Sequence, residues 1–173
     1  MSPLDIVLYP DEGLREVCAP VAEMNDDLDK LIDEMFYTMY DAPGIGLAAP
    51  QIAVQQRLIV VDVSENQDEP LALMNPEILQ SAGKITWEEG CLSIPGVYGK
   101  VDRPSEILVQ GMDRDGKIIE VEAKDLLAVC IQHEIDHLNG KLFIDHLSGL
   151  KRTRALQKYK KELAERASER NAE

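Results

Sequence analysis

Apolar residues recur at helical spacing in three stretches of the chain. In the stretch 27–40 they stand three and four positions apart, as in an amphipathic helix, at Leu28, Leu31, Ile32, Met35, Phe36 and Met39. The same spacing returns over 123–138, where the following pair Asn139 and Gly140 is a helix stop signal. A last helix is expected over 150–166. The pattern therefore predicts an N-terminal helix, a central helix and a C-terminal helix.

Strand-like segments fill most of the region between the first two helices. The run 57–63 is rich in β-branched residues, and 72–79 and 85–87 suggest further short strands. The runs 107–112 and 117–121 flank an Asp-Gly turn signal, so they are expected to form an antiparallel hairpin. The sequence predicts the α+β class, with mostly antiparallel sheets around the central helix.

The segment between the first helix and the first strand is rich in residues that break regular structure. Over 41–51 it reads DAPGIGLAAPQ, and its prolines and glycines interrupt helical hydrogen bonding. We expect an irregular loop that lines a site. Gly44 and Gly46 suit either a plain turn or the close backbone approach of an extended substrate.

Length and composition indicate one soluble globular domain covering residues 1–173. No apolar run approaches the ~20 residues of a transmembrane helix, and the first thirty residues lack a signal or transit pattern. A cytoplasmic protein without a membrane partner is therefore expected. The three cysteines are an odd number, which argues against a disulfide framework and leaves a metal or reactive role open.

Charge is distributed unevenly along the chain. The net charge of −14 argues against a protein that coats DNA or RNA, because such proteins need a basic face. The stretch 151–161, KRTRALQKYKK, is the exception, with six basic and no acidic side chains. Residues 150–173 are therefore interpreted as a charged C-terminal helix and tail.

The strongest chemical signal is His133-Glu-Ile-Asp-His137 within the central helix. Histidines four positions apart project from one helix face, so both imidazoles can bind one divalent cation. Glu134 flanks the same face, offset by roughly 60° from His137 at ~100° per residue, and can handle protons beside the ion. This arrangement favours metal-dependent hydrolysis.

A catalytic site of this kind needs a third protein ligand and one open position. Phe143 occupies the place where one class of zinc peptidases has a third histidine. Glu162 and Glu165 are alternatives, but both belong to a charged helix where solvated glutamates are expected. Cys130 precedes His133 by one turn and should point away from the ion, toward an adjacent pocket. Cys91, after a strand and beside a glycine, is the better ligand.

Three segments taken together resemble the signature motifs of the peptide deformylase family, in the family's order. They are GIGLAAPQ over 44–51, EGCLS over 89–93 and QHEIDHL over 132–138. The similarity extends over nearly the whole chain and is greatest to bacterial members. It implies one catalytic domain that removes the formyl group from N-terminal formylmethionine of nascent polypeptides, by means of metal-bound hydroxide.

The resemblance also implies roles for individual residues. Cys91, His133 and His137 would be the metal ligands, and Glu134 the general acid and base. Gln51 and the backbone N–H of Leu92 would stabilise the oxyanion. The ion would be Fe2+ in the cell, with Zn2+, Ni2+ or Co2+ in purified protein. Members bind an extended peptide with its methionine in an apolar pocket, and the substrate-binding residues here would be Gly44, Ile45, Gly46, Glu89, Gly90, Leu126, Val129 and Cys130.

Two further implications concern structural support and partners. Glu89 and Arg103 resemble an ion pair that steadies the active-site loop. The basic segment 151–161 suggests docking on ribosomal RNA, with a solvated helix face as the alternative. Pro43 stands where related bacterial sequences often have an acidic residue, and the segment around Tyr98 stands in place of a basic variant. The resemblance therefore does not fix the peptide preference beyond methionine.

Three rival functions use the same residues differently. A metal-dependent endopeptidase would cleave internal peptide bonds, but Phe143 and Cys91 argue against it. A noncatalytic, ribosome-associated metal protein would not need Glu134 or Gln51, and both are present. A thiol hydrolase would use Cys91 as its nucleophile and stay active after complete chelation of metal.

Overall fold

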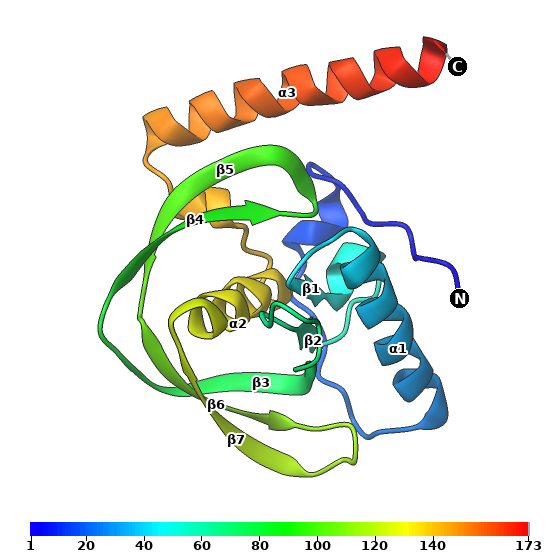
Figure 1. The fold of residues 1–173 in the computed structure, drawn as a ribbon, viewed down its shortest axis with the longest axis vertical. Coiled ribbons are helices and arrows are strands. Elements are labelled where there is room, and N and C mark those ends of the chain that lie inside the picture. The colour runs from blue at the N-terminus through cyan, green and yellow to red at the C-terminus, as the bar shows by residue number, and fades with distance from the viewer. Residues whose placement is uncertain (173) are drawn as a thin grey trace.

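The computed structural model describes residues 1–172, and Glu173 of the expected tail lies outside the described residues. Three α-helices and seven strands make up the fold (Figure 1), with all the strands between α1 and α2 along the chain. The helices are α1 (Asp26–Asp41), α2 (Asp125–Leu138) and α3 (Gly149–Ala172). The strands are β1 (Gly46–Ala48), β2 (Leu58–Val61), β3 (Leu71–Ala82), β4 (Ile85–Cys91), β5 (Ile94–Arg103), β6 (Glu106–Met112) and β7 (Ile118–Lys124). Short 3-10 turns are η1 (Glu12–Arg15), η2 (Ala49–Ile52) and η3 (Phe143–His146).

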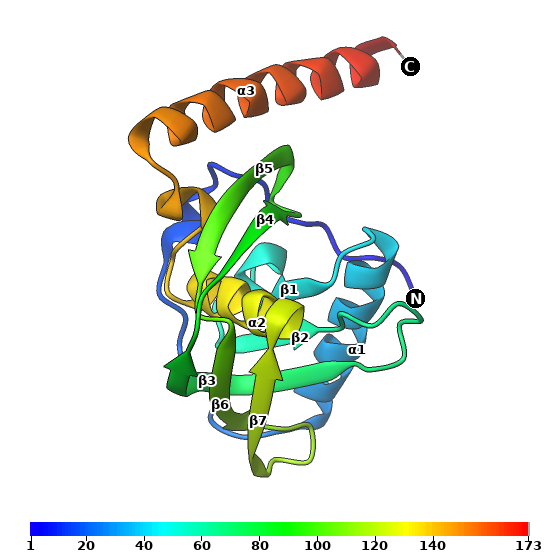
Figure 2. The same ribbon diagram turned by 60° about the vertical axis from the view of Figure 1, so that its left-hand side comes forward.

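The strands form two antiparallel sheets. The larger sheet has the order β1-β2-β3-β6-β7, so β1 and β7 are its edge strands. The smaller sheet is the ribbon of β4 and β5. Figure 2 shows α2 lying between this ribbon and the larger sheet. The fold therefore places one helix where side chains of both sheets can reach it.

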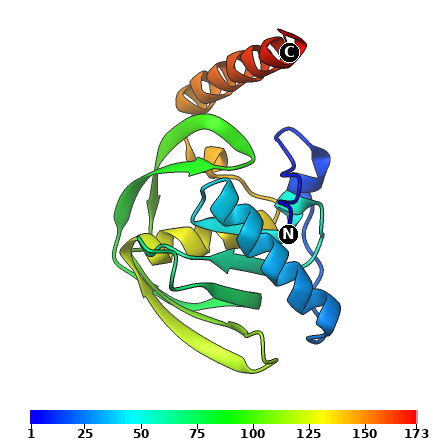
Figure 3. The ribbon, with the colours of Figure 1, turned by 45° about the vertical axis from the view of Figure 1, so that its right-hand side comes forward.

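Apolar burial explains why α2 is central. Its Ala128, Ile131 and Leu138 are fully buried and pack against β2, β3 and β6. Figure 3 shows α1 beside the β1–β2 end of the larger sheet, on the side opposite α2. The apolar stripe of α1 packs there in a second core cluster. At ~25 cal/mol per Å2 of buried apolar surface, a large buried side chain such as that of Ile131 or Leu138 contributes about 1.5–3 kcal/mol. The helix that carries the histidines is thus held on several sides.

The C-terminal helix packs on β5 (Figure 1). Its buried Ala155 and Tyr159 join an apolar cluster with β5 and η3. The Tyr159 hydroxyl also donates a hydrogen bond of 2.6 Å to the Tyr9 carbonyl. Within residues 1–172, no helix combines the length and the apolar character that crossing a bilayer requires.

The α+β class, the three predicted helices and the 107–121 hairpin are confirmed, the last with Met112 opposite Ile118. The stretch before α1 contains the short turn η1 and an isolated β-bridge between Ala19 and Gln56. Other boundaries were wrong. Residues 123 and 124 end β7 instead of beginning α2, and the expected loop 41–51 contains β1 and most of η2. The sequence pattern also gave no sign of β5, and α3 continues beyond residue 166.

Candidate active site

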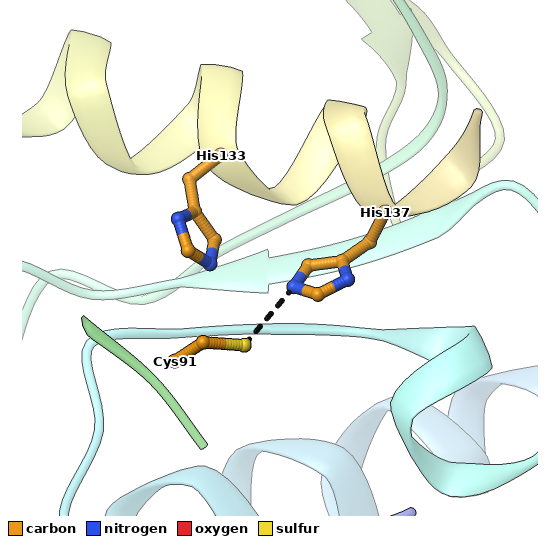
Figure 4. Close-up of side chains that lie close together, drawn as sticks. All are labelled: Cys91, His133 and His137. Atoms are coloured by element: carbon orange, nitrogen blue, oxygen red, sulfur yellow. Dashed lines mark hydrogen bonds between the residues drawn. The ribbon is translucent and has the colours of Figure 1, made fainter. Parts of the chain in front are cut away.

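The helix face that carries His133 and His137 is buried inside the molecule. His133 and His137 are 8% and 1% exposed, and the end of β4 brings Cys91 to them. Donor atoms of the three residues all lie within 4.8 Å of one another, with Cys91 Sγ and His137 Nε2 3.4 Å apart. Figure 4 shows the three side chains converging on one point from the helix and the ribbon.

A register shift in the β4–β5 ribbon positions the thiol. Gly90 pairs with Tyr98, but the next residue, Cys91, pairs with Ile94 across a tight turn. Such an irregularity re-aims a side chain at a strand end. An added Cβ at position 90 would lie 2.7 Å from the exposed Tyr98 ring, so that ring would have to move. The local sequence thus presents Cys91 toward α2.

A buried ion pair orients His133. Glu89 accepts a hydrogen bond of 2.9 Å from His133 Nδ1, which leaves Nε2 for a metal ion. Arg103 binds both oxygens of the same carboxylate, at 2.6 and 3.0 Å. Burial opposes ionisation of Glu89, but its bonds to His133 and Arg103 outweigh this and lower its pKa. The predicted pairing of Glu89 with Arg103 is present, and the Glu89 carboxylate is occupied by it.

This support continues to the surface through residues that the sequence analysis did not identify. Arg103 donates to Asp136 at 3.0 Å, and His146 Nε2 lies 2.8 Å from the same carboxylate oxygen. Asp136 stands directly before His137 in the HEIDH motif, and this position is the sequence signal that could have identified it as a supporting residue. His146 lies on η3, and no sequence pattern links it to α2.

Glu134 is a buried carboxylate beside the donor cluster. It is 4% exposed, and its Oε1 has no hydrogen-bond partner among the described residues. Burial raises the pKa of Glu134 to about 7. A carboxyl group with this pKa can both accept and release a proton near neutral pH. An added Cβ at Gly46 would overlap this carboxylate and lie 2.8 Å from Cys130 Sγ.

Gln51 reaches the same centre from η2. Its Oε1 accepts a hydrogen bond of 2.9 Å from Ala48 N, which fixes the orientation of the amide. Its Nε2 donates to Ser93 Oγ at 3.1 Å and approaches Cys91 Sγ at 3.5 Å. Ser93, which the sequence analysis did not single out, thus helps to aim this amide. Leu92 lines the adjoining cavity.

A cavity of about 730 Å3 opens beside these groups. Edge strand β1 borders it, so an extended peptide can lie along that strand. Cys130 points into the cavity region with its Sγ 3.4 Å from the Ile45 carbonyl, and it is absent from the donor cluster, as expected. All residues expected to contact substrate line the cavity, namely Gly44, Ile45, Gly46, Glu89, Gly90, Leu126, Val129 and Cys130.

The donor set fits a divalent metal ion. Two imidazoles and one thiolate provide three ligands, which is the number found in catalytic sites that keep a position open for water. Burial and the neighbouring His133 lower the pKa of His137, which keeps its imidazole neutral as a ligand must be. Glu162 is not part of the cluster and instead packs against Gly96. An α+β fold with this centre and a buried carboxylate defines a metal-dependent hydrolase.

Comparison with known proteins agrees with this class. The family model described as polypeptide deformylase matches residues 3–153. A peptide deformylase from Hydrogenovibrio crunogenus is 83% identical over 168 residues, covering 97% of this chain and 99% of that protein. One from Alkalilimnicola ehrlichii is 56% identical over 162 residues, covering 93% and 91%.

Solved structures give the same result. A crystal structure of a peptide deformylase from Legionella pneumophila superposes with a TM-score of 0.92 at 48% identity, covering 96% of this chain and 98% of that one. One from Synechococcus elongatus in complex with actinonin has a TM-score of 0.87 at 45% identity, covering 91% and 88%. The chain therefore belongs to the polypeptide deformylase family. It is a metal-dependent hydrolase that removes the formyl group from nascent peptides, and the endopeptidase and noncatalytic alternatives are not favoured.

Proposed function

We propose that this chain hydrolyses the formamide of N-terminal formylmethionine at the centre formed by Cys91, His133 and His137, with Glu134 moving the proton. The observation that carries this assignment is the buried, unpartnered Oε1 of Glu134 beside three converging ligand side chains. A buried carboxylate oxygen without a partner is costly unless water or substrate binds it. Buried polar atoms without a protein partner are therefore typical of functional sites.

The roles of the protein groups follow from their positions. When bound, a divalent ion lowers the pKa of a water ligand and polarises the formyl carbonyl. Glu134 takes a proton from the attacking water and delivers it to the amine nitrogen as the C–N bond breaks. The Gln51 amide and the Leu92 N–H donate to the oxygen that becomes negative at the formyl carbon. The products are formate and a peptide with a free N-terminal amine.

Substrate binding is proposed along the edge of β1. Gly44 and Gly46 allow the peptide backbone to approach, and the methionine side chain enters the apolar part of the cavity near Leu126 and Val129. Cys130 contributes to the same wall, where burial raises its thiol pKa and keeps it uncharged. An uncharged wall suits a thioether side chain.

Replacing Gln51 with Glu is expected to lower kcat by about 10²-fold or more. This change keeps the oxygen that accepts from Ala48 N and removes the Nε2 donor that lies beside Cys91 Sγ. Because the donor acts mainly on the transition state, KM is expected to change little. Steady-state rates with formyl-Met-Ala-Ser measure both constants, and Ser93→Ala, which removes only the partner at 3.1 Å, should have a smaller effect. An unchanged kcat in the Glu variant would refute the role of Gln51.

We propose Fe2+ as the ion in the cell, with Zn2+, Ni2+ or Co2+ present in purified samples. Two imidazoles and one thiolate suit all four ions, and availability decides among them. Metal analysis of protein isolated without oxygen tests this, since zinc as the sole metal there would contradict the iron assignment. The cytoplasm is the proposed compartment, because nascent formylated chains emerge there.

Ribosome docking is proposed through the basic stretch 151–161. The side chains of Lys151, Arg154, Lys158, Lys160 and Lys161 are exposed, whereas Arg152 is engaged with the carbonyls of η3 and residue 147. A variant with glutamine at the five exposed positions is expected to lose co-sedimentation with ribosomes at low salt, while the folded core stays intact. The wild-type interaction should weaken steeply as salt rises. Equal co-sedimentation of both proteins would reject docking through this stretch.

A further inference from the structure

The C-terminal helix reaches the substrate cavity through one side chain, Arg166. This residue lines the cavity although it lies beyond the basic stretch of α3. It follows the buried Tyr159 by seven residues, which at ~100° per residue places both on the same side of the helix. That side packs on β5. Arg166 is therefore directed toward the cavity by the packing of α3.

One contact within the helix engages the Arg166 side chain and leaves most of its guanidinium available. Arg166 Nε lies 3.5 Å from Glu162 Oε1, one turn earlier. Glu162 in turn packs against the backbone of Gly96, whose added Cβ would lie 3.0 Å from its carboxyl carbon. Among residues 1–172, the Arg166 side chain has no other ion-pair or hydrogen-bond partner. Its two terminal amino groups can therefore bind a carboxylate in the bidentate manner that guanidinium favours.

The charges that line the cavity give Arg166 a distinct role. Glu89 is occupied by Arg103 and His133, and Glu134 belongs to the reaction centre. Glu88 is the other acidic lining residue. Among the described residues that line the cavity, Arg166 is the one lysine or arginine. An anionic group in this cavity would therefore find its cationic partner at α3.

We propose that Arg166 forms an outer subsite that binds an acidic side chain of the substrate downstream of formylmethionine. The proposal rests on the proposed function, since it concerns peptides bound at that same centre. An extended peptide advances ~3.3 Å per residue, so with methionine in the inner pocket the next residues extend toward the cavity rim. The basic stretch 151–161 and Arg166 lie on the same helix, and they would then contact different partners, the ribosome and the substrate peptide.

The test compares formylated peptides that differ in one charge. The peptides are formyl-Met-Ala-Xaa-Ala-amide and formyl-Met-Ala-Ala-Xaa-amide, with Asp, Asn or Lys as Xaa and an amidated end that removes the terminal carboxylate. For at least one of the two positions, wild type is expected to prefer Asp over Asn by about threefold in kcat/KM, as an exposed ion pair supplies. The preference should reside mainly in KM and diminish at high salt.

Charge reversal supplies the sharper comparison. Arg166→Glu is expected to invert the Asp-to-Lys preference, changing that ratio by about tenfold. Lys161→Glu makes the same change in net charge on the same helix, but Lys161 does not line the cavity and should leave the ratio as in wild type. A ratio that is the same in both variants, in an active enzyme, overturns the subsite alone. Absence of formate from every peptide overturns the proposed function and the subsite together.

Discussion

Glu134→Gln is expected to lower kcat for formate release by about 10²–10⁴-fold, the usual contribution of a positioned acid or base. Glutamine has nearly the same shape as glutamate, so the side chain should still pack against Gly46 and helix α2 should keep its structure. It cannot accept a proton from water or deliver one to the departing amine. The loss should therefore appear in kcat more than in KM.

Two measurements separate this loss from damage to the metal centre. Metal content per chain should equal that of wild type, because Cys91, His133 and His137 are unchanged. The circular dichroism spectrum should also match. A variant that keeps its metal and more than a tenth of the wild-type kcat would exclude Glu134 as the group that transfers the proton.

Arg103→Ala is expected to lower the free energy of unfolding by about 3–5 kcal/mol, as when one partner of a buried ion pair is removed. Arg103 is 6% exposed and binds two carboxylates, those of Glu89 and Asp136. Its loss removes both guanidinium hydrogen bonds from the buried Glu89 carboxylate. Urea unfolding of the metal-free proteins at pH 7 measures the difference.

Arg114 provides the matched control, because it also joins two carboxylates, Asp29 and Asp33, but at the surface. Arg114→Ala should cost at most about 1 kcal/mol. The pKa of Glu89 is lowered in the fold, so its ionised form stabilises the protein above its unfolded pKa of ~4.3 and loses that effect as pH falls through the lower, folded value. The cost of Arg103→Ala should therefore shrink on acidification. Equal costs for both variants would mean that Arg103 has no special structural role.

The sequence predicted the parts of this molecule that depend on local pattern. The helix α1 follows from its apolar spacing, and the β6–β7 hairpin from its Asp-Gly turn. The metal centre was predicted in a similar way, since HEIDH places two imidazoles on one face wherever the helix lies. Residue spacing alone favoured Cys91 as third ligand without deciding it, because the β4–β5 ribbon that delivers it is a nonlocal feature.

The features that were missed depend on long-range packing. Strand β5 carries glycines at 96 and 99 and a mixed burial pattern, so alternation did not reveal it. Helix α2 begins only at Asp125 because Ala123 and Lys124 complete the ladder with β6. Ser93 and Arg166 reach the site through the ribbon turn and the docking of α3, and neither has a local signature. Such contacts are set by tertiary structure, which overrides local propensity.

The most direct test of the central claim is formate release from formyl-Met-Ala-Ser by the full chain, prepared without oxygen and supplied with iron or nickel. We expect one formate and one new N-terminal amine per peptide, with no cleavage of internal bonds. Complete chelation should abolish the reaction, and returning the metal should restore it. No formate from the metal-loaded protein, or undiminished activity after complete chelation, would contradict the assignment.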